Sequence, residues 1–208
     1  MNGRLSRRTA LATGTALLVW PRLSRAAMDP ARAAEFIRTT GNRLVAIING
    51  GGSLEQRRAQ VAEVLRAAVD IEGVGRFILG RWWNLASEAE RREYLLLFEE
   101  IIIRNLSSRF GELAGVRFSI GRSQPRTEDD VLVSTEVVQP GSPPFALDWL
   151  VAEVAGQPKV VDVVAEGASL RLTTRSEYSS VISRNGGRVG PLLDAMRQQI
   201  ARLASQER

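Results

Sequence analysis

One change in the spacing of apolar residues, near Val116, constrains the fold of this chain of 208 residues more than any other feature. Before that point apolar residues recur every three or four positions, as they do over 61–69, which predicts helices with one buried face. Beyond it they alternate with polar residues at every second position, as over 131–137, which predicts strands. Helical spacing returns over 170–184 and 189–204, so a sheet is expected between two helical regions.

Four consecutive predicted strands with short connections favour an antiparallel meander, with Gly156-Gln157-Pro158 as one of its hairpin turns. Helix starts are also marked in the sequence: Asp29-Pro30 opens the first helix, and capping boxes begin at Ser53 and Ser87. The expected fold class is therefore α+β. A helical layer should pack on a twisted antiparallel sheet of four or slightly more strands.

The long helix that is expected to follow Ser87 and end near Arg109 has more apolar positions than one buried stripe requires. Such a helix is covered on more than one side, or it lines a cavity as well as a core. Together with the apolar strand faces, it favours an apolar cavity between the helical layer and the sheet. Core packing without a cavity is the alternative interpretation.

Residues 1–26 are interpreted as a cleavable export signal. Arg4 and the run Ser6-Arg7-Arg8 give it a positive start, and a mostly apolar stretch follows over 9–20. That stretch is shorter than the roughly 20 residues that span a bilayer. Ser24-Arg25-Ala26 supplies small residues for cleavage, and the arginine pair is a partial twin-arginine pattern, so general and twin-arginine export both stay open. A helix that remains attached as an anchor is the alternative.

The net charge of +5 belongs entirely to this predicted signal. The chain has 28 Lys and Arg against 23 Asp and Glu, and five arginines but no acid lie in 1–26, which leaves 23 against 23. In the remainder the arginines are interleaved with acids and do not cluster with aromatic residues, so no nucleic-acid partner is expected. About 180 residues without a long linker favour one domain, 27–208, which export would place in the periplasm.

The chain contains neither His nor Cys, which removes several classes of chemistry. A Ser-His-Asp triad, a thiolate nucleophile and a zinc site built on these ligands are all impossible. Asp148, Asp162 and Glu166 lie on or beside neighbouring predicted strands, where a carboxylate pair could act as acid and base, but ion pairs are the preferred interpretation. The expected arginine partners are Arg81, Arg171 and Arg175. No catalytic residue, metal site or cofactor is predicted.

Several sequence blocks together resemble a family signature. They are LGRWW at 79–83, ERREY at 90–94, DVVAEGAS at 162–169, RSEY at 175–178 and NGG at 185–187. In this order and spacing the chain resembles the MlaC family, the periplasmic phospholipid carriers also called toluene-tolerance auxiliary proteins. The resemblance extends from about Phe36 to Arg197. Tyr94 and Tyr178 stand where the family often has Phe, and Pro158-Lys159 stands where it often has an aromatic residue.

The resemblance implies a non-enzymatic carrier that encloses the acyl chains of a phospholipid in an apolar cavity and leaves the headgroup at its mouth. As a monomer, it would exchange lipid with an inner-membrane ABC transporter bearing MCE-domain subunits and with an outer-membrane lipoprotein–porin complex. This lipid transport would maintain the lipid asymmetry of the outer membrane. Two alternatives stay open: a hopanoid-associated carrier of the same family, and a periplasmic adaptor without a lipid cavity.

The hypothesis for the cavity lining takes the apolar positions of the two layers that should face each other. They are Phe77, Ile78, Trp82, Trp83, Tyr94, Phe98, Ile101, Leu147, Trp149, Val151, Val161 and Val163. Four polar positions also match the family, and we expect them to hold the fold rather than to contact the ligand. They are Arg81, Asp162, Glu166 and Arg175.

Overall fold

The computed structural model describes residues 28–206, and an antiparallel sheet in the order β1-β2-β3-β4-β5 forms one layer of it. The strands are β1 (Arg117–Pro125), β2 (Asp130–Val138), β3 (Phe145–Val154), β4 (Gln157–Ala165) and β5 (Ala168–Ser169). Every strand pairs with its neighbour in the sequence, so the predicted meander is confirmed, with a two-residue fifth strand added. The predicted export signal lies outside the described residues.

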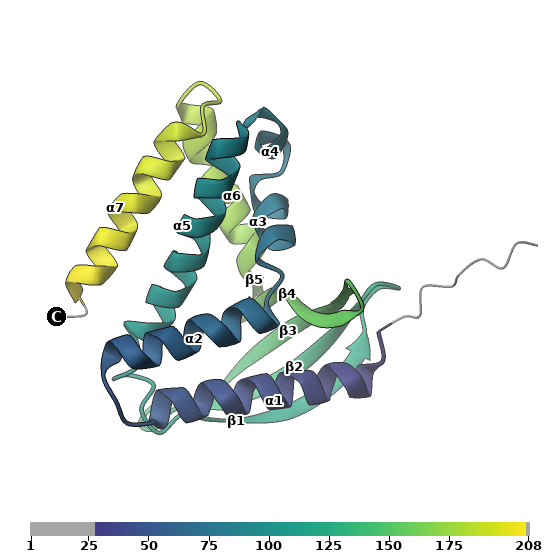
Figure 1. Cartoon of the computed structure of the whole chain (residues 1–208). Helices are drawn as coiled ribbons and strands as arrows, with labels where there is room; N and C mark the ends of the chain where they lie inside the picture. Colours follow the sequence, from purple (N-terminus) through teal and green to yellow (C-terminus); the bar gives the residue numbers. More distant parts are fainter. Residues whose placement is uncertain (1–27, 207–208) are drawn as a thin grey trace, which may run out of the picture.

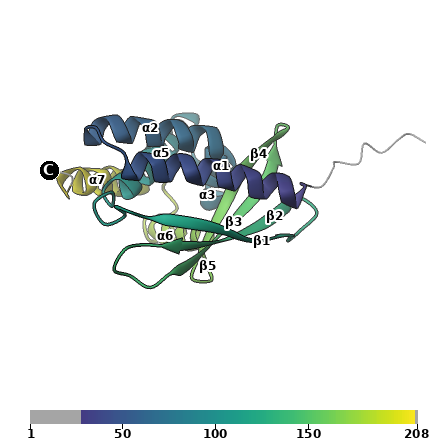
Figure 2. The same cartoon turned by 90° about the horizontal axis from the view of Figure 1, so that it is seen from below.

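Helices account for most of the rest of the described chain. They are α1 (Pro30–Asn49), α2 (Leu54–Ala68), α3 (Ile71–Leu79), α4 (Arg81–Leu85), α5 (Glu88–Ser107), α6 (Leu170–Arg184) and α7 (Gly190–Gln206). Helices α1 and α2 lie side by side over one face of the sheet, whereas α3, α5, α6 and α7 stand together as a bundle that rises from one end of it (Figures 1 and 2). The α+β class predicted from the sequence is confirmed.

Local sequence signals explain where the helices begin. The hydroxyl of Ser53 accepts a hydrogen bond from the backbone N–H of Gln56, and the Gln56 side chain in turn accepts one from the Ser53 N–H. Ser87 and Glu90 form the same reciprocal pair at the start of α5. Each predicted capping box is thus confirmed, and each satisfies N–H groups that the helix itself leaves without acceptors.

The turn between β3 and β4 lies one residue earlier than the sequence predicts. Val154 pairs with Gln157, so the turn consists of Ala155 and Gly156, and Pro158 lies within β4. Ala155 and Gly156 both have positive φ, 49° and 78°, as a tight hairpin turn with this twist requires. Pattern reading missed this because alanine rarely adopts such a conformation and therefore gives no turn signal.

Three separate apolar clusters form the interior of the described chain. The bundle cluster consists of Ile78, Leu79, Trp82, Ala86, Tyr94, Phe98, Ile101, Ile182, Val189, Leu192, Leu193 and Met196. The α2 cluster consists of Ile47, Ile48, Val61, Ala62, Val64, Leu65, Ile103, Phe110, Val116 and Val137. The sheet cluster, under α1, consists of Met28, Ala33, Ile37, Val131, Val133, Val151 and Val160.

Helix α5 connects two of these clusters. Tyr94, Phe98 and Ile101 lie in the bundle cluster, whereas Ile103 lies in the α2 cluster on another side of the same helix. This double coverage accounts for the wide apolar surface seen in its sequence. Within the described part of the chain, none of the helices combines the length and apolar character needed to cross a membrane.

Candidate functional site

The predicted lining residues from the helices gather in the bundle cluster. Ile78, Trp82, Tyr94, Phe98 and Ile101 are buried there. Phe77 and Trp83 pack at its edge and are only partly buried. Most of the other described residues in this cluster come from α6, α7 and the turn between them, and none of them comes from the sheet. The bundle therefore covers these aromatic side chains mainly with other helices.

The predicted lining residues from the strands lie on the sheet. Trp149 pairs with Val133 on one side and Val163 on the other, and all three contribute to the sheet cluster under α1. Val151 is fully buried in the same cluster, whereas Leu147 packs against the α2 cluster. Val161 is the inserted residue of a β-bulge, since its neighbours on either side, but not Val161 itself, pair with β3.

The structure thus brings the candidates together in two sets, one in the bundle and one on the sheet. Among the described residues, no cluster contains members of both sets. Leu147, Trp149, Val161, Val163 and Phe77 are each only partly buried. Two surface pockets of about 370 Å³ and 360 Å³ lie on α6 and beside the α6–α7 turn, and neither lies between α1 and the sheet.

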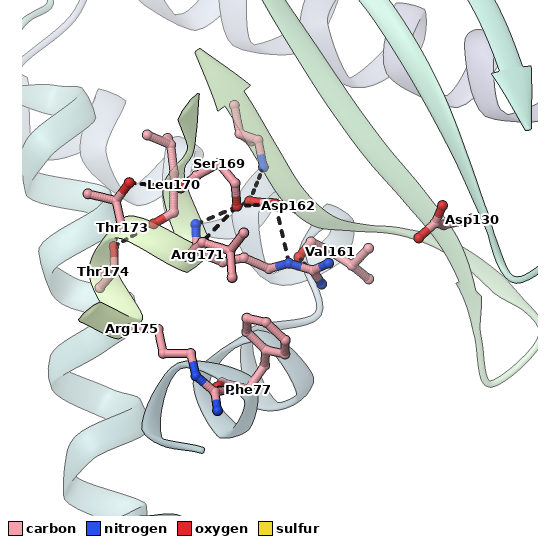
Figure 3. Close-up of polar contacts among 12 residues, drawn as sticks. Phe77, Asp130, Val161, Asp162, Ser169, Leu170, Arg171, Thr173, Thr174 and Arg175 are labelled. Carbon is pink, nitrogen blue, oxygen red and sulfur yellow. Dashed lines mark hydrogen bonds and ion pairs between the residues drawn. The ribbon is translucent and has the colours of Figure 1, made fainter. Parts of the chain in front are cut away.

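A buried carboxylate joins the sheet to the bundle where β4, β5 and α6 meet (Figure 3). Asp162 accepts a hydrogen bond of 2.6 Å from the Ser169 hydroxyl. It also accepts hydrogen bonds from the backbone N–H of Val163 at 2.8 Å and from that of Arg171 at 3.1 Å. The Arg171 Nε lies 3.2 Å from its Oδ2, and only 2% of the Asp162 side chain is exposed. Since Ser169 also caps α6, one carboxylate fixes the start of this helix against β4.

Two arginines of α6 hold the ring of Phe77, near the end of α3 (Figure 3). The guanidinium carbon of Arg171 lies 4.5 Å from the ring centroid and that of Arg175 lies 4.9 Å from it. Arg175 also donates a hydrogen bond of 2.6 Å to the Phe77 carbonyl oxygen. Because a cation over an aromatic face is attracted to it, these contacts clamp α3 to α6 beside the buried Asp162.

The polar positions that the sequence singled out thus have different roles. The predicted ion pair between Asp162 and Arg171 is confirmed, and Arg175 joins the same junction through Phe77. Arg81 is exposed, with its guanidinium over the ring of Trp82. Glu166 is exposed in the turn between β4 and β5, and neither it nor Asp148 pairs with these arginines among the described residues.

Two tyrosines inside the bundle have strongly altered acidity. Burial, and to a lesser extent repulsion from Tyr178, raises the pKa of the Tyr94 hydroxyl well above its ordinary value of 10.0. Burial, followed by the charge of Glu177, raises the pKa of Tyr178 to about 12. The Tyr94 hydroxyl donates a hydrogen bond to the Gly75 carbonyl oxygen, and the rings of Tyr94 and Tyr178 contact each other edge to face. Both tyrosines therefore serve as packing groups of the bundle.

Comparison with known proteins places this geometry in a family. The model of the MlaC protein family matches residues 38–198, which include the sheet, the Asp162 junction and most of the bundle. The chain belongs to the MlaC family. A solved structure of a phospholipid-binding protein from Ralstonia solanacearum, in complex with a phospholipid, has the same fold, with a TM-score of 0.75 and 24% sequence identity. The match covers 83% of this chain and 98% of that protein.

All the predicted lining residues lie inside the range matched by the MlaC family model. Sequence reasoning missed two features of the junction, the Ser169 hydroxyl and the clamp on Phe77. The signal for Ser169 was present, since this residue closes the same sequence block that Asp162 opens. The clamp on Phe77 gave no signal, because it depends on the packing of α6 against α3.

Proposed function

We propose that this chain is a phospholipid carrier of the MlaC family, which holds acyl chains between its helices and its sheet. The observation that carries the proposal is the shared fold with a protein solved in complex with a phospholipid, over 98% of that protein's length. Membership of the MlaC family supports the same conclusion. No second function has a comparable observation in its favour.

The distribution of apolar side chains fits this role. Acyl chains in water cost roughly 0.8 kcal/mol per CH₂ group, so a carrier must enclose them. Trp149 and Val163 on the sheet and Phe77 on α3 are candidates that the fold leaves only partly buried. In this proposal, acyl chains enter between the helices and the sheet and replace contacts that these side chains make with the protein.

Membership of the family and the predicted export signal support a finer role, which we also propose. The carrier would work as a monomer in the periplasm, between an inner-membrane ABC transporter with MCE-domain subunits and an outer-membrane lipoprotein–porin complex. It would thereby maintain the lipid asymmetry of the outer membrane. We further propose that it is not an enzyme, so the lipid it releases is chemically the lipid it received.

Native mass spectrometry of the purified protein, with extraction of any bound lipid, tests this function. A two-chain phospholipid supports the proposal, and its unchanged mass after incubation supports a carrier over an enzyme. Extraction of a polycyclic lipid instead would identify the ligand as a hopanoid rather than a phospholipid. A protein that purifies without lipid and also takes none from phospholipid vesicles would refute lipid carriage and favour an adaptor.

A pair of matched variants locates the site. Trp149→Asp places a charge among the candidate lining residues, and we expect it to abolish lipid retention because a buried carboxylate beside acyl chains is costly. Leu96→Asp introduces the same charge at a residue of α5 that is 70% exposed, and lipid retention should persist. Val163→Phe fills space without adding charge and should lower retention even if Trp149→Asp fails to fold. Equal retention by all three proteins would place the lipid elsewhere.

A further inference from the structure

A pocket of about 370 Å³ opens on the exposed side of α6, beside the junction described above. Its lining consists of Leu172, Arg175, Ser176, Ser179, Ser180 and Ser183. These positions lie three or four residues apart and therefore follow one side of the helix. One guanidinium and four hydroxyl groups thus border a single hollow, with an apolar side chain at one end.

The charge of Arg175 has no carboxylate partner among the described residues, unlike that of Arg171, which pairs with Asp162. Arg175 donates one N–H to the Phe77 carbonyl and rests on the Phe77 ring. Its remaining N–H groups have no acceptor within the described part of the chain. A partly buried guanidinium in this state attracts an anion, and its planar set of donors matches a phosphate in particular.

The serine hydroxyls extend this donor set. Ser179 accepts a hydrogen bond of 3.2 Å from the indole Nε1–H of Trp82, which leaves its own O–H available to an acceptor in the pocket. The hydroxyls of Ser176, Ser180 and Ser183 make no hydrogen bond to another group that the structure describes. A phosphate accepts several hydrogen bonds at once, and this pocket offers several donors, one guanidinium and four hydroxyls, with no carboxylate in its lining.

We propose that this pocket binds the phosphate group of the lipid, with Arg175 as its cation and the serines of α6 as further donors. The proposal rests on the proposed function and specifies which part of the lipid α6 holds. Arg175 lies between the pocket and Phe77, a candidate contact for the acyl chains, so a phosphate bound here leaves the glycerol beside an apolar surface. Leu172, which is 55% exposed, adds to that surface. The site therefore favours phospholipids over neutral lipids with the same chains.

The test compares uptake of a phospholipid and of diacylglycerol with the same acyl chains, each from vesicles, by the full protein and its variants. Arg175→Gln removes the cation, and Ser180→Asp places a carboxylate in the pocket without touching the contacts of Phe77. Phospholipid retention should fall about tenfold or more in both, since charge-assisted hydrogen bonds to phosphate are lost or opposed. Diacylglycerol retention should not change in Ser180→Asp, which leaves the contacts of Phe77 with Arg175 in place. Arg202→Gln, an exposed position on α7, removes the same single charge outside the pocket and should retain both lipids.

The outcomes separate this site from the proposed function. If the unaltered protein takes up lipid but Arg175→Gln and Ser180→Asp bind phospholipid as well as it does, the phosphate site is refuted and lipid carriage stands. If the unaltered protein takes up no lipid, lipid carriage is refuted. Whether the pocket binds phosphate is then decided by titrating the protein with inorganic phosphate and measuring the NMR chemical shifts of the backbone amides over 175–183. Shifts that Ser180→Asp removes would support a phosphate site, and their absence would overturn it.

Discussion

Replacing Asp162 with asparagine should lower the free energy of unfolding by about 3 kcal/mol, because it breaks a buried ion pair while keeping the shape of the side chain. The asparagine would retain one oxygen for the backbone N–H groups of Val163 and Arg171, which both donate to Oδ1. Its amide nitrogen would replace Oδ2, the oxygen that accepts from Ser169 and lies 3.2 Å from the Arg171 Nε. Two donors would then face each other at a site where 2% of the side chain is exposed.

The size of the effect follows from the groups that lose a partner. A hydrogen bond to a charged group contributes about 1.5–3 kcal/mol, and removing one member of a buried ion pair costs about 3–5 kcal/mol. We place the expected loss at the lower end, because Arg171 is 19% exposed and water can reach part of its guanidinium. Ser169 cannot compensate fully: its oxygen can accept from the asparagine amide as well as from the Leu172 N–H, but its own O–H then loses Oδ2 as acceptor.

Urea unfolding followed by far-UV circular dichroism measures this loss, and Asp130→Asn provides the matched control. Asp130 pairs with Arg126 in two contacts of 3.2 Å, but 45% of the Arg126 side chain is exposed, so its loss should cost no more than about 1 kcal/mol. If Asp162→Asn and Asp130→Asn have the same midpoint and slope, the junction does not hold the helices to the sheet as described.

Three further predictions concern packing and turns. The chain has two tyrosines, and in the folded protein neither should ionise near pH 10, so absorbance at alkaline pH should show Tyr178 titrating near 12. The free energy of unfolding should keep the full contribution of the two tyrosines below pH 10. It should fall between pH 10 and 12, because the unfolded state releases its protons first. A titration at pH 10 before unfolding would contradict this. Ala155→Asn should raise stability by about 1 kcal/mol in thermal unfolding, since asparagine tolerates positive φ better than alanine. Gly75→Ala should cost about 1–3 kcal/mol, because the new methyl carbon would lie 2.7 Å from Leu95 Cδ2 and 3.2 Å from Tyr94 Cε1; an unchanged melting temperature would show that these side chains move freely.

Local features of the sequence predicted the secondary structure well, because periodicity and capping are properties of neighbouring residues. The change of spacing near Val116 separates α5 from β1, and both capping boxes form as predicted. The ion pair of Asp162 with Arg171 was also predictable, since only a short strand and turn lie between them. What failed locally was the turn at Ala155, where the chain adopts a conformation that the residue itself disfavours.

The division of the candidate lining could not be predicted in the same way. Periodicity shows that one face of a helix is buried but does not show which element covers it. Tyr94 and Phe98 were expected to face the sheet, yet they pack in a cluster with Ile182, Leu192 and Met196 from α6 and α7. The apolar faces of both sets are buried, as predicted, but the two sets do not line one common surface, and the lining stays a hypothesis.

The packing of the candidate lining residues bears on how a carrier could release what it binds. Were the helices and the sheet to part without lipid, the apolar side chains between them would meet water at a cost of roughly 25 cal/mol per Å² of apolar surface. Packing Trp149 and Val163 under α1, and Phe77 under the arginines of α6, avoids that cost in the absence of lipid. Acyl chains must then compete with contacts inside the protein, which weakens binding relative to an empty cavity. In the proposed function this weakening is useful, because a protein that transfers lipid between two complexes has to give it up at one of them.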